Sequence, residues 1–290
     1  MRLIATAALV LPLLAGCGGA GDSGDSEELT VLTAFYPLQY VTQRIVGDET
    51  EVGSLTSPGT EPHDAELSMT QTAEVIDADV LVYLSEFQPA VDDAVEQAEE
   101  AALVDASGPS DLLPLDEGDD PHFWLDPVRL AAVAGDVAAA LTEVDPDNST
   151  AYAANLEDLE RDLAILDEEI TSGLADCRLD SVVVSHDAFG YWASRYGLDM
   201  HAIAGLSPES EPSAAHLAEL QELIEAEGIT TVFSETLASP KMAETLSADL
   251  GLSTAVLDPV EGLGDETFDE DYLSLMRANL DALQKANDCR

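Results

Sequence analysis

A single long helical pattern in the middle of the chain constrains the fold most strongly. From about residue 147 to residue 175 the sequence contains no proline, and its apolar residues recur at the spacing of one helix face. On either side, short runs rich in β-branched residues alternate with amphipathic helical patterns, which is typical of α/β units. The expected strands are residues 29–35, 50–56, 80–85 and 101–107 before the long helix, and 181–185, 198–204, 229–235 and 253–258 after it. This arrangement predicts an α/β fold of two similar lobes joined by a long helix.

The first 17 residues indicate export from the cytoplasm. Arg2 precedes an apolar stretch, residues 3–15, that is too short to span a membrane as a mature helix and is typical of a secretory signal. Residues 14–17 read LAGC, which resembles a bacterial lipobox in which Cys17 is lipidated and becomes the new N-terminus. The alternative is an ordinary signal cleaved nearby that leaves Cys17 as a free thiol. Residues 18–28, rich in Gly, Ser and Asp, then form a flexible tether.

The rest of the chain divides into three parts, and the last part begins and ends near a cysteine. We expect an N-terminal lobe over residues 29–144, a linker helix over residues 145–176 and a C-terminal lobe over residues 177–290. Cys177 and Cys289 are an even pair in an oxidising compartment, so a disulfide is expected between them. The chain-entropy argument allows such a bridge at most about 4–5 kcal/mol of stabilisation. Two buried free thiols are the alternative that the sequence leaves open.

The charge of the chain excludes one class of partner. Its 290 residues include 59 acidic and 10 basic side chains, which give a formal net charge of -49. Because no basic patch is available to neutralise phosphates, nucleic acid is not an expected partner. An acidic surface concentrates small cations, but its more general effect is solubility.

Four polar residues stand close to the ends of expected strands. His63, His122, His186 and Asp258 belong to four separate units, too far apart in sequence for a zinc finger or a single-helix metal motif. In open α/β sheets, ligands bind beyond the carboxyl ends of the strands, where loops from several units meet. These four side chains can therefore converge on one point in the crevice between the lobes.

His122 is flanked by residues that would fix its position. Asp126 followed by Pro127 is a helix start, with a capping carboxylate and a proline in the first turn. Residues 123–125, Phe-Trp-Leu, would pack the loop against a lobe and hold the imidazole at the crevice, where a dry shell strengthens a bond to metal. The rival interpretation is a partly buried histidine that is satisfied by a neighbouring carboxylate.

Five short segments carry a resemblance to a known family. In chain order, on either side of the long helix, they read EPHDAELS, HFWLDP, SHDAFGYWA, FSETLASPK and VLDPVEG. Together they resemble the metal-specific substrate-binding lipoproteins of bacterial ABC importers, in particular the zinc-binding members, over nearly the whole chain from about Leu29. The resemblance implies two (β/α) lobes bridged by a rigid helix, with one metal ion in the crevice. Residue by residue it implies His63, His122 and His186 as metal ligands, with Asp258 in the fourth, carboxylate position.

The donor atoms of this set favour zinc. Three imidazoles and one carboxylate are a nitrogen-rich, four-coordinate set that suits Zn(II), whereas Mn(II) prefers more oxygen and a higher coordination number. Manganese-binding members of the family typically have glutamate at the third ligand position, where this chain has His186. Many zinc-binding members carry a histidine-rich acidic loop before the second ligand, and the acidic segment here, residues 108–120, has no histidine. That departure bears on metal scavenging more than on the site itself.

Two further acids could support the site. Glu235, at the end of an expected strand, points to the crevice and could hold a histidine tautomer, with a helix cap or a surface acid as the alternative. Glu61 could contribute an oxygen, but its place before Pro62 favours a role in shaping the loop. His201 and His216 match no ligand motif and are interpreted as structural or solvated.

Three classes of function are compatible with these residues. The first is an extracytoplasmic monomer, anchored to the outer face of the membrane by its lipid, that captures Zn(II) and delivers it to a membrane permease driven by a separate cytoplasmic ATPase. Mn(II) or Fe(II) is the alternative cargo, and the chain has no GxxxxGK phosphate loop with which to hydrolyse ATP itself. The second is a zinc hydrolase, but a fourth protein ligand would close the water position and no HExxH motif supplies a base. The third is a surface adhesin, for which the sequence shows no separate module. A binding protein, not an enzyme, is the expected function.

Overall fold

The computed structural model describes residues 29–48, 50–116 and 118–290 of the chain. The expected signal (residues 1–17) and tether (residues 18–28) lie outside these described residues, and so does Cys17. None of the helices in the described part has both the length and the apolar character that a membrane crossing requires.

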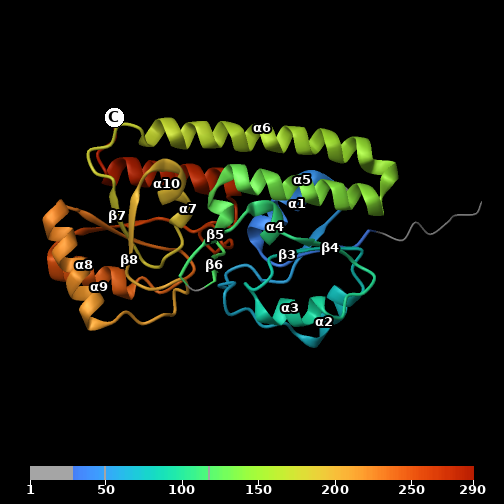
Figure 1. Ribbon diagram of the computed structural model, residues 1–290, viewed down its shortest axis with the longest axis horizontal. Coiled ribbons are helices and arrows are strands. Elements are labelled where there is room, and N and C mark those ends of the chain that lie inside the picture. Colours follow the sequence, from blue (N-terminus) through green and yellow to red (C-terminus); the bar gives the residue numbers. More distant parts are fainter. Residues whose placement is uncertain (1–28, 49, 117) are drawn as a thin grey trace, which may run out of the picture.

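Two parallel sheets of four strands each form the two lobes (Figure 1). The N-terminal sheet has the strand order β2-β1-β3-β4, and the C-terminal sheet has the order β10-β9-β7-β8. Because all neighbouring strands in each sheet run parallel, their carboxyl ends meet at one edge. The strands are β1 Val31–Thr33, β2 Val52–Ser54, β3 Val80–Tyr83, β4 Ala102–Asp105, β7 Ser181–Val184, β8 Asp199–Ala202, β9 Thr231–Ser234 and β10 Ser253–Val256.

Helices connect the strands, and a small hairpin interrupts this pattern after β4. The helices are α1 Tyr36–Val46, α2 Met69–Ile76, α3 Pro89–Val95, α4 Ser107–Ser110, α5 Pro127–Val144, α6 Ser149–Leu174, α7 Gly190–Tyr196, α8 Ala214–Glu227, α9 Lys241–Leu250 and α10 Tyr272–Ala286, with 3-10 turns at Phe123–Leu125 and Pro146–Asn148. The hairpin, which the sequence patterns did not predict, pairs β5 Leu113–Pro114 with β6 Asp119–Asp120. Its far end leads directly to His122.

The predicted long helix is α6, which runs for 26 residues along both lobes (Figure 1). It packs on α1, α5 and α10. Its buried side chains recur at helical spacing and are Tyr152, Leu159, Leu163, Leu166, Ile170 and Leu174. Burial of this apolar stripe holds so long a helix in place more firmly than helix propensity alone would. The prediction of an α/β fold with two lobes and a joining helix is confirmed.

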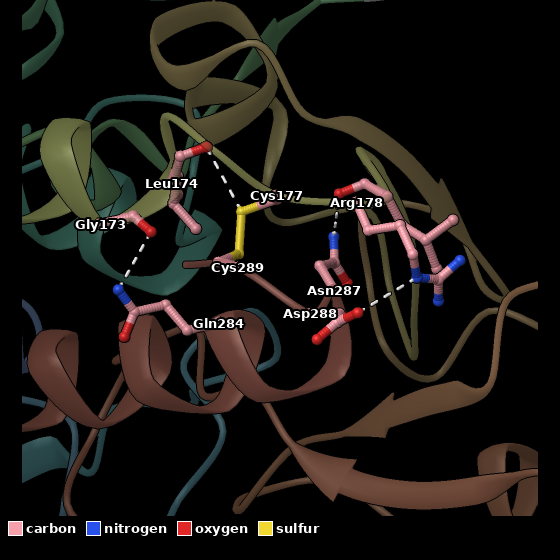
Figure 2. Close-up of a disulfide and its surroundings, with 9 residues drawn as sticks. Gly173, Leu174, Cys177, Arg178, Gln284, Asn287, Asp288 and Cys289 are labelled. Carbon is pink, nitrogen blue, oxygen red and sulfur yellow. Dashed lines mark hydrogen bonds and ion pairs between the residues drawn. A yellow bond between two sulfur atoms is a disulfide. The ribbon is translucent and has the colours of Figure 1, made fainter.

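A disulfide ties the end of α6 to the C-terminus. Cys177, just past α6, is bonded to Cys289, as the cysteine pair predicted (Figure 2). A hydrogen bond lies beside the bridge, in which Gln284 Nε2 donates to the Gly173 carbonyl at 3.0 Å. The start of the C-terminal lobe and its last helix are therefore fixed to each other.

The two lobes share a hydrophobic core as well as a helix. One cluster of buried side chains includes Leu81 of the first sheet, Leu163 of α6 and Val184 of the second sheet. A smaller cluster lies on the other face of the second sheet, where Val183 packs with Ile224 of α8. Val183 and Val184 belong to different clusters because successive side chains of a strand point to opposite faces of the sheet. The sequence patterns, which treated the lobes as separate units, did not predict the shared core.

Candidate metal site

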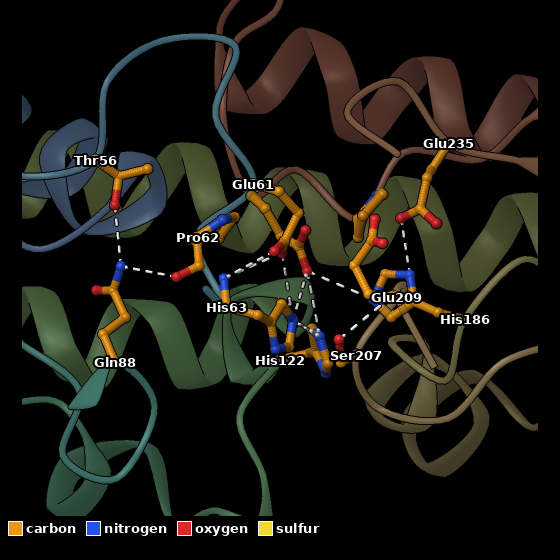
Figure 3. Close-up of polar contacts among 12 residues, drawn as sticks. Thr56, Glu61, Pro62, His63, Gln88, His122, His186, Ser207, Glu209 and Glu235 are labelled. Carbon is orange, nitrogen blue, oxygen red and sulfur yellow. Dashed lines mark hydrogen bonds and ion pairs between the residues drawn. The ribbon is translucent and has the colours of Figure 1, made fainter. Parts of the chain in front are cut away.

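Loops from both lobes bring three histidines, labelled in Figure 3, together with one glutamate, Glu261. In the part of the chain that the structure describes, His63, His122, His186 and Glu261 are the one group of His, Cys, Asp or Glu residues with the geometry to hold a metal ion. Each offers one ligand atom, and these atoms all lie within 4.8 Å of one another. Three of the four residues are those predicted from the ends of the strands.

His63 lies in the loop after β2 and is the one partly exposed member of the group, with 11% of its side chain accessible. Its Nε2 lies 3.3 Å from Oε1 of Glu261 and 3.8 Å from Oε1 of Glu61. The main-chain N–H of His63 donates to the Glu61 carboxylate at 3.1 Å. Glu61 thus shapes the loop, and its carboxylate also lies close to the imidazole.

His122 is fully buried, and a carboxylate fixes its ring. Its Nδ1 lies 2.8 Å from Oδ1 of Asp120, which also accepts the main-chain N–H of His122 at 3.0 Å. With Nδ1 donating to Asp120, Nε2 is the nitrogen that faces the site, where it lies 3.3 Å from Oε1 of Glu261. The histidine is therefore both satisfied by a neighbouring carboxylate and available as a ligand, so the two interpretations of the sequence do not exclude each other.

Asp120 was not identified from the sequence, although it belongs to the acidic run before His122. Its carboxylate lies so close to the start of α7 that a Cβ added at Gly190 would come within 2.5 Å of Oδ2. Phe123, Trp124 and Leu125 are buried as expected, and Asp126 caps α5 by accepting the N–H of residue 128 at 2.9 Å. The loop is thus fixed at both ends of the histidine.

His186, at the end of β7, repeats this arrangement from the other lobe. Its Nδ1 lies 2.8 Å from Oε2 of Glu235 (Figure 3). The other oxygen of Glu235 accepts the Ser185 hydroxyl at 2.7 Å. Its Nε2 is buried and has no hydrogen-bond partner among the described residues. A buried nitrogen without a partner costs free energy unless a ligand pairs with it. Glu235 therefore lies where a residue that fixes a ligand tautomer has to lie.

Glu261, rather than Asp258, is the carboxylate that the structure brings to the histidines. Its Oε1 lies 3.3 Å from Nε2 of His63, 3.3 Å from that of His122 and 3.5 Å from that of His186. The expected fourth residue, Asp258, does not belong to the group. Both carboxylates stand in the same VLDPVEG segment, and the first of the two was chosen from the sequence because it ends the strand.

The members of the group alter each other's protonation. Burial lowers the pKa of His186, but the hydrogen bond to the Glu235 carboxylate and the negative charge of the nearby Glu261 carboxylate outweigh it and raise the pKa to about 10. For His122 the same balance of burial and carboxylate bonds also raises the pKa. Burial raises the pKa of Glu261, yet bonds from the histidines hold it well below its usual value. These shifts favour protonated imidazoles at His122 and His186, and an incoming metal ion has to displace such protons.

One cavity borders this group, and a second cavity is lined by the two other histidines. His63 lines a groove of about 500 Å³ together with Phe87 of its own lobe and Ser207 of the other. His201 and His216, interpreted as structural or solvated, line a different cavity of about 540 Å³. There His216 Nε2 donates to the Ala202 carbonyl at 2.8 Å, and neither histidine belongs to the metal group.

A buried cluster of three imidazoles and one carboxylate between two α/β lobes defines a bilobed metal-binding protein. The sequence matches the family described as zinc-uptake complex component A periplasmic (ZnuA) over residues 31–286, and the chain belongs to this family. It is 34% identical to the high-affinity zinc uptake system protein ZnuA of Bacillus subtilis (strain 168) over 297 aligned residues, which cover 94% of this chain and 93% of that protein.

Further relatives are zinc-binding proteins of streptococci. The chain is 36% identical to the zinc-binding lipoprotein AdcA of Streptococcus pneumoniae serotype 4 over 282 residues, which are 90% of this chain but 56% of that protein. It therefore spans little more than half the length of AdcA. The crystal structure of the Zn(II)-bound ZnuA-like domain of AdcA has a TM-score of 0.78 and 37% identity, covering 90% of this chain and 99% of that domain.

Proposed function

We propose that this chain is an extracytoplasmic binding protein that captures Zn(II) and delivers it to an ABC permease for import. The proposed ligands are His63, His122, His186 and Glu261. One observation carries the proposal: four ligand atoms from four separate loops lie within 4.8 Å of one another at a nearly buried place. The lobes that close on the ion would be residues 29–144 and 177–290, joined by residues 145–176.

The donor set supports zinc as the cargo. Mn(II) or Fe(II) is the alternative cargo. Nitrogen-rich, four-coordinate sites suit Zn(II), whereas Mn(II) favours sites richer in oxygen. The names of the relatives, zinc-binding lipoprotein and zinc uptake system protein, point the same way. A hydrolase would need an open position for water, and Glu261 would supply a fourth protein ligand to the proposed set.

We further propose that Cys17 carries a lipid that holds the protein, as a monomer, on the outer face of the membrane. The tether of residues 18–28 would then let it reach a permease that a cytoplasmic ATPase drives. The lipobox of this chain and the name of the AdcA lipoprotein support the anchor. Cys17→Ala should leave the protein unprocessed or soluble, and unchanged membrane fractionation of this variant would count against the anchor.

The test of the cargo is a metal analysis of protein purified without chelator, followed by competition between Zn(II) and Mn(II). The parent should hold one Zn(II) per chain and prefer it. His186→Glu keeps four ligands but exchanges nitrogen for oxygen and adds charge, so the preference for zinc should narrow. His216→Ala, a histidine outside the group, should change neither metal content nor preference. An equally selective His186→Glu protein, or a parent that binds no zinc, would contradict the proposal.

A further inference from the structure

Asp258 is buried beside the metal group, but both oxygens of its carboxylate are bonded elsewhere. Oδ2 accepts the hydroxyl of Thr236 at 2.6 Å, and Oδ1 accepts the main-chain N–H of Val260 at 2.7 Å. A buried carboxylate is costly unless hydrogen bonds replace the water that it loses. These two bonds therefore indicate that Asp258 fixes the chain around it.

The chain turns sharply between Asp258 and Glu261. Val260 has a φ of 57°, in the left-handed region that β-branched residues rarely adopt. Its side chain is fully buried, and such a conformation persists only where the surroundings enforce it. The bond from the Val260 N–H to Asp258 is part of that enforcement. Because of this turn, Asp258 meets Thr236 while Glu261 meets the histidines.

Asn279 of α10 holds the start of the turn with both ends of its amide. Its Oδ1 accepts the main-chain N–H of Asp258 at 2.8 Å, and its Nδ2 donates to the Asp258 carbonyl at 2.6 Å. Asn279 is 2% exposed. An ionised carboxylate could accept the first bond but not donate the second, and an aliphatic side chain could make neither. The amide thus pairs with both main-chain polar groups of Asp258, as a neighbouring strand would in a sheet.

The other side of the turn is tied to the loop of His122. Trp124 Nε1 donates to the Pro259 carbonyl at 2.8 Å, and the Tyr272 hydroxyl donates to the Trp124 carbonyl at 2.6 Å. Trp124 and Tyr272 are both fully buried. The place of Glu261 relative to His122 is therefore set through this turn.

We propose that Asn279 and Asp258 are positioning residues of the metal site. They hold the turn at residues 259–261 so that one oxygen of Glu261 meets all three imidazoles, and this geometry favours Zn(II) over Mn(II). The proposal rests on the zinc-binding function proposed above. A looser turn would let the carboxylate rotate, offer its second oxygen or admit water, and the higher coordination number that results is tolerated better by Mn(II).

Asn279→Ala is the primary test. It should lower the Zn(II) affinity roughly 10–100-fold, the range typical for loss of a group that orients a metal ligand, and it should narrow the Zn(II)-to-Mn(II) preference. Co(II), used as a spectroscopic substitute for Zn(II), should give weaker d–d absorption in this variant than in the parent, because tetrahedral Co(II) absorbs more strongly than five- or six-coordinate Co(II).

Asn287→Ala is the matched control, because Asn287 is a similarly buried amide at the end of the same helix. Its Nδ2 donates to the Leu179 carbonyl at 3.1 Å, beside the disulfide (Figure 2). The control should lower the melting temperature of the metal-free protein and leave the metal preference and the Co(II) spectrum unchanged. If Asn279→Ala behaves in the same way, its role is structural only and the inference is overturned.

Thr236→Val provides a second variant in case Asn279→Ala does not fold. Thr236 is exposed, and the substitution removes only the hydroxyl that donates to Asp258. A smaller shift of preference and spectrum in the same direction is expected, and an unchanged preference and spectrum would overturn the inference. A parent that fails to bind Zn(II) would instead contradict the proposed function, so the two failures are distinguishable.

Discussion

The loops that carry His63 and His122 both leave the N-terminal sheet, but different parts of the molecule hold them. The His122 loop is fastened to the C-terminal lobe. The Tyr191 hydroxyl and the Trp192 ring nitrogen, both on α7, donate to its main-chain carbonyls at 2.7 and 2.8 Å. The bonds that Trp124 makes and accepts add to these ties to the C-terminal lobe, while the Trp124 ring also packs on Phe35 and Phe87 of the N-terminal lobe.

The His63 loop is held mainly by its own lobe. Gln88, a buried residue that follows β3, donates to the Pro62 carbonyl at 3.0 Å (Figure 3). A main-chain bond from Gly59 to the Leu263 carbonyl at 2.7 Å reaches across to the other lobe. Most of the residues of this loop, 57–68, are exposed.

The proposed ligands therefore divide three to one, although two come from each half of the chain. His186 and Glu261 belong to the C-terminal lobe and the His122 loop is hydrogen-bonded to it, whereas His63 comes from a loop of the N-terminal lobe, with its Nε2 3.3 Å from Oε1 of Glu261. We expect that any separation of the lobes withdraws His63 from three ligands that remain assembled.

Removal of a ligand from the assembled three should have the largest effect. His122→Ala leaves a buried hole and frees Asp120, so zinc affinity should fall by more than the roughly 100-fold that loss of an orienting group can cost. His63→Ala should be less damaging, since water can reach this partly exposed position. Isothermal titration of both variants, with His216→Ala as the control, measures the difference. Equal losses for His63→Ala and His122→Ala would break the three-to-one division.

Substitution of the acid beside His122 should lower zinc affinity more than substitution of the acid beside His63. Asp120→Asn loses the charged acceptor that fixes Nδ1 of His122, so zinc affinity should fall roughly 10–100-fold. Glu61→Gln keeps an oxygen that can accept the main-chain N–H of His63, so its effect should be smaller. Competition against a zinc-binding dye ranks the two variants. If Glu61→Gln loses more zinc affinity than Asp120→Asn, the carboxylate beside His63 matters more than the one beside His122, and the expectation is wrong.

Zinc binding should release protons from His122 and His186. The pKa of His186 is raised to about 10, so this imidazole is protonated below that pH, and the raised pKa of His122 favours its protonated form as well; zinc has to displace these protons. Affinity should therefore fall as pH falls from 8 to 6, by about tenfold per pH unit for each proton displaced. Titrations in buffers of different ionisation enthalpy count the protons, and Glu235→Gln should reduce the number released at pH 7. An affinity that does not change with pH would contradict this expectation.

The smallest effect should appear in backbone dynamics. In the metal-free protein, the amides of residues 57–68 should exchange with deuterium faster than those of residues 119–126, because fewer buried contacts hold them. Zinc should slow exchange more in the first segment than in the second. Exchange measured by mass spectrometry gives both rates, and faster exchange in the second segment would reverse the comparison.

The fold was predictable because it follows from local periodicity. The apolar stripe of α6 and the short β-branched runs at each strand can be read without knowledge of distant contacts. His63, His122 and His186 were predictable for a related reason: each stands in a loop of a β/α unit, and such loops converge where strands of a parallel sheet end. The short hairpin before His122 has no periodicity to reveal it, and the shared core depends on how the lobes pack.

The fourth residue was not predictable, because it depends on contacts far apart in sequence. Whether Asp258 or Glu261 meets the histidines is decided by the left-handed turn at Val260, and Asn279 and Trp124 stabilise that turn from other elements. No local pattern in VLDPVEG expresses those contacts. Asp120 was missed because nothing in a run of acids marks one of them as buried.

The most direct test of the account is a crystal structure of the zinc-loaded protein, with anomalous diffraction measured on both sides of the zinc absorption edge. One anomalous peak should lie among Nε2 of His63, His122 and His186 and a carboxylate oxygen of Glu261, at the roughly 2.0–2.2 Å distances of zinc ligands. Asp258 should keep its bonds to Thr236 and Val260. A peak bound by Asp258 instead of Glu261, or one located at His201 and His216, would contradict the account.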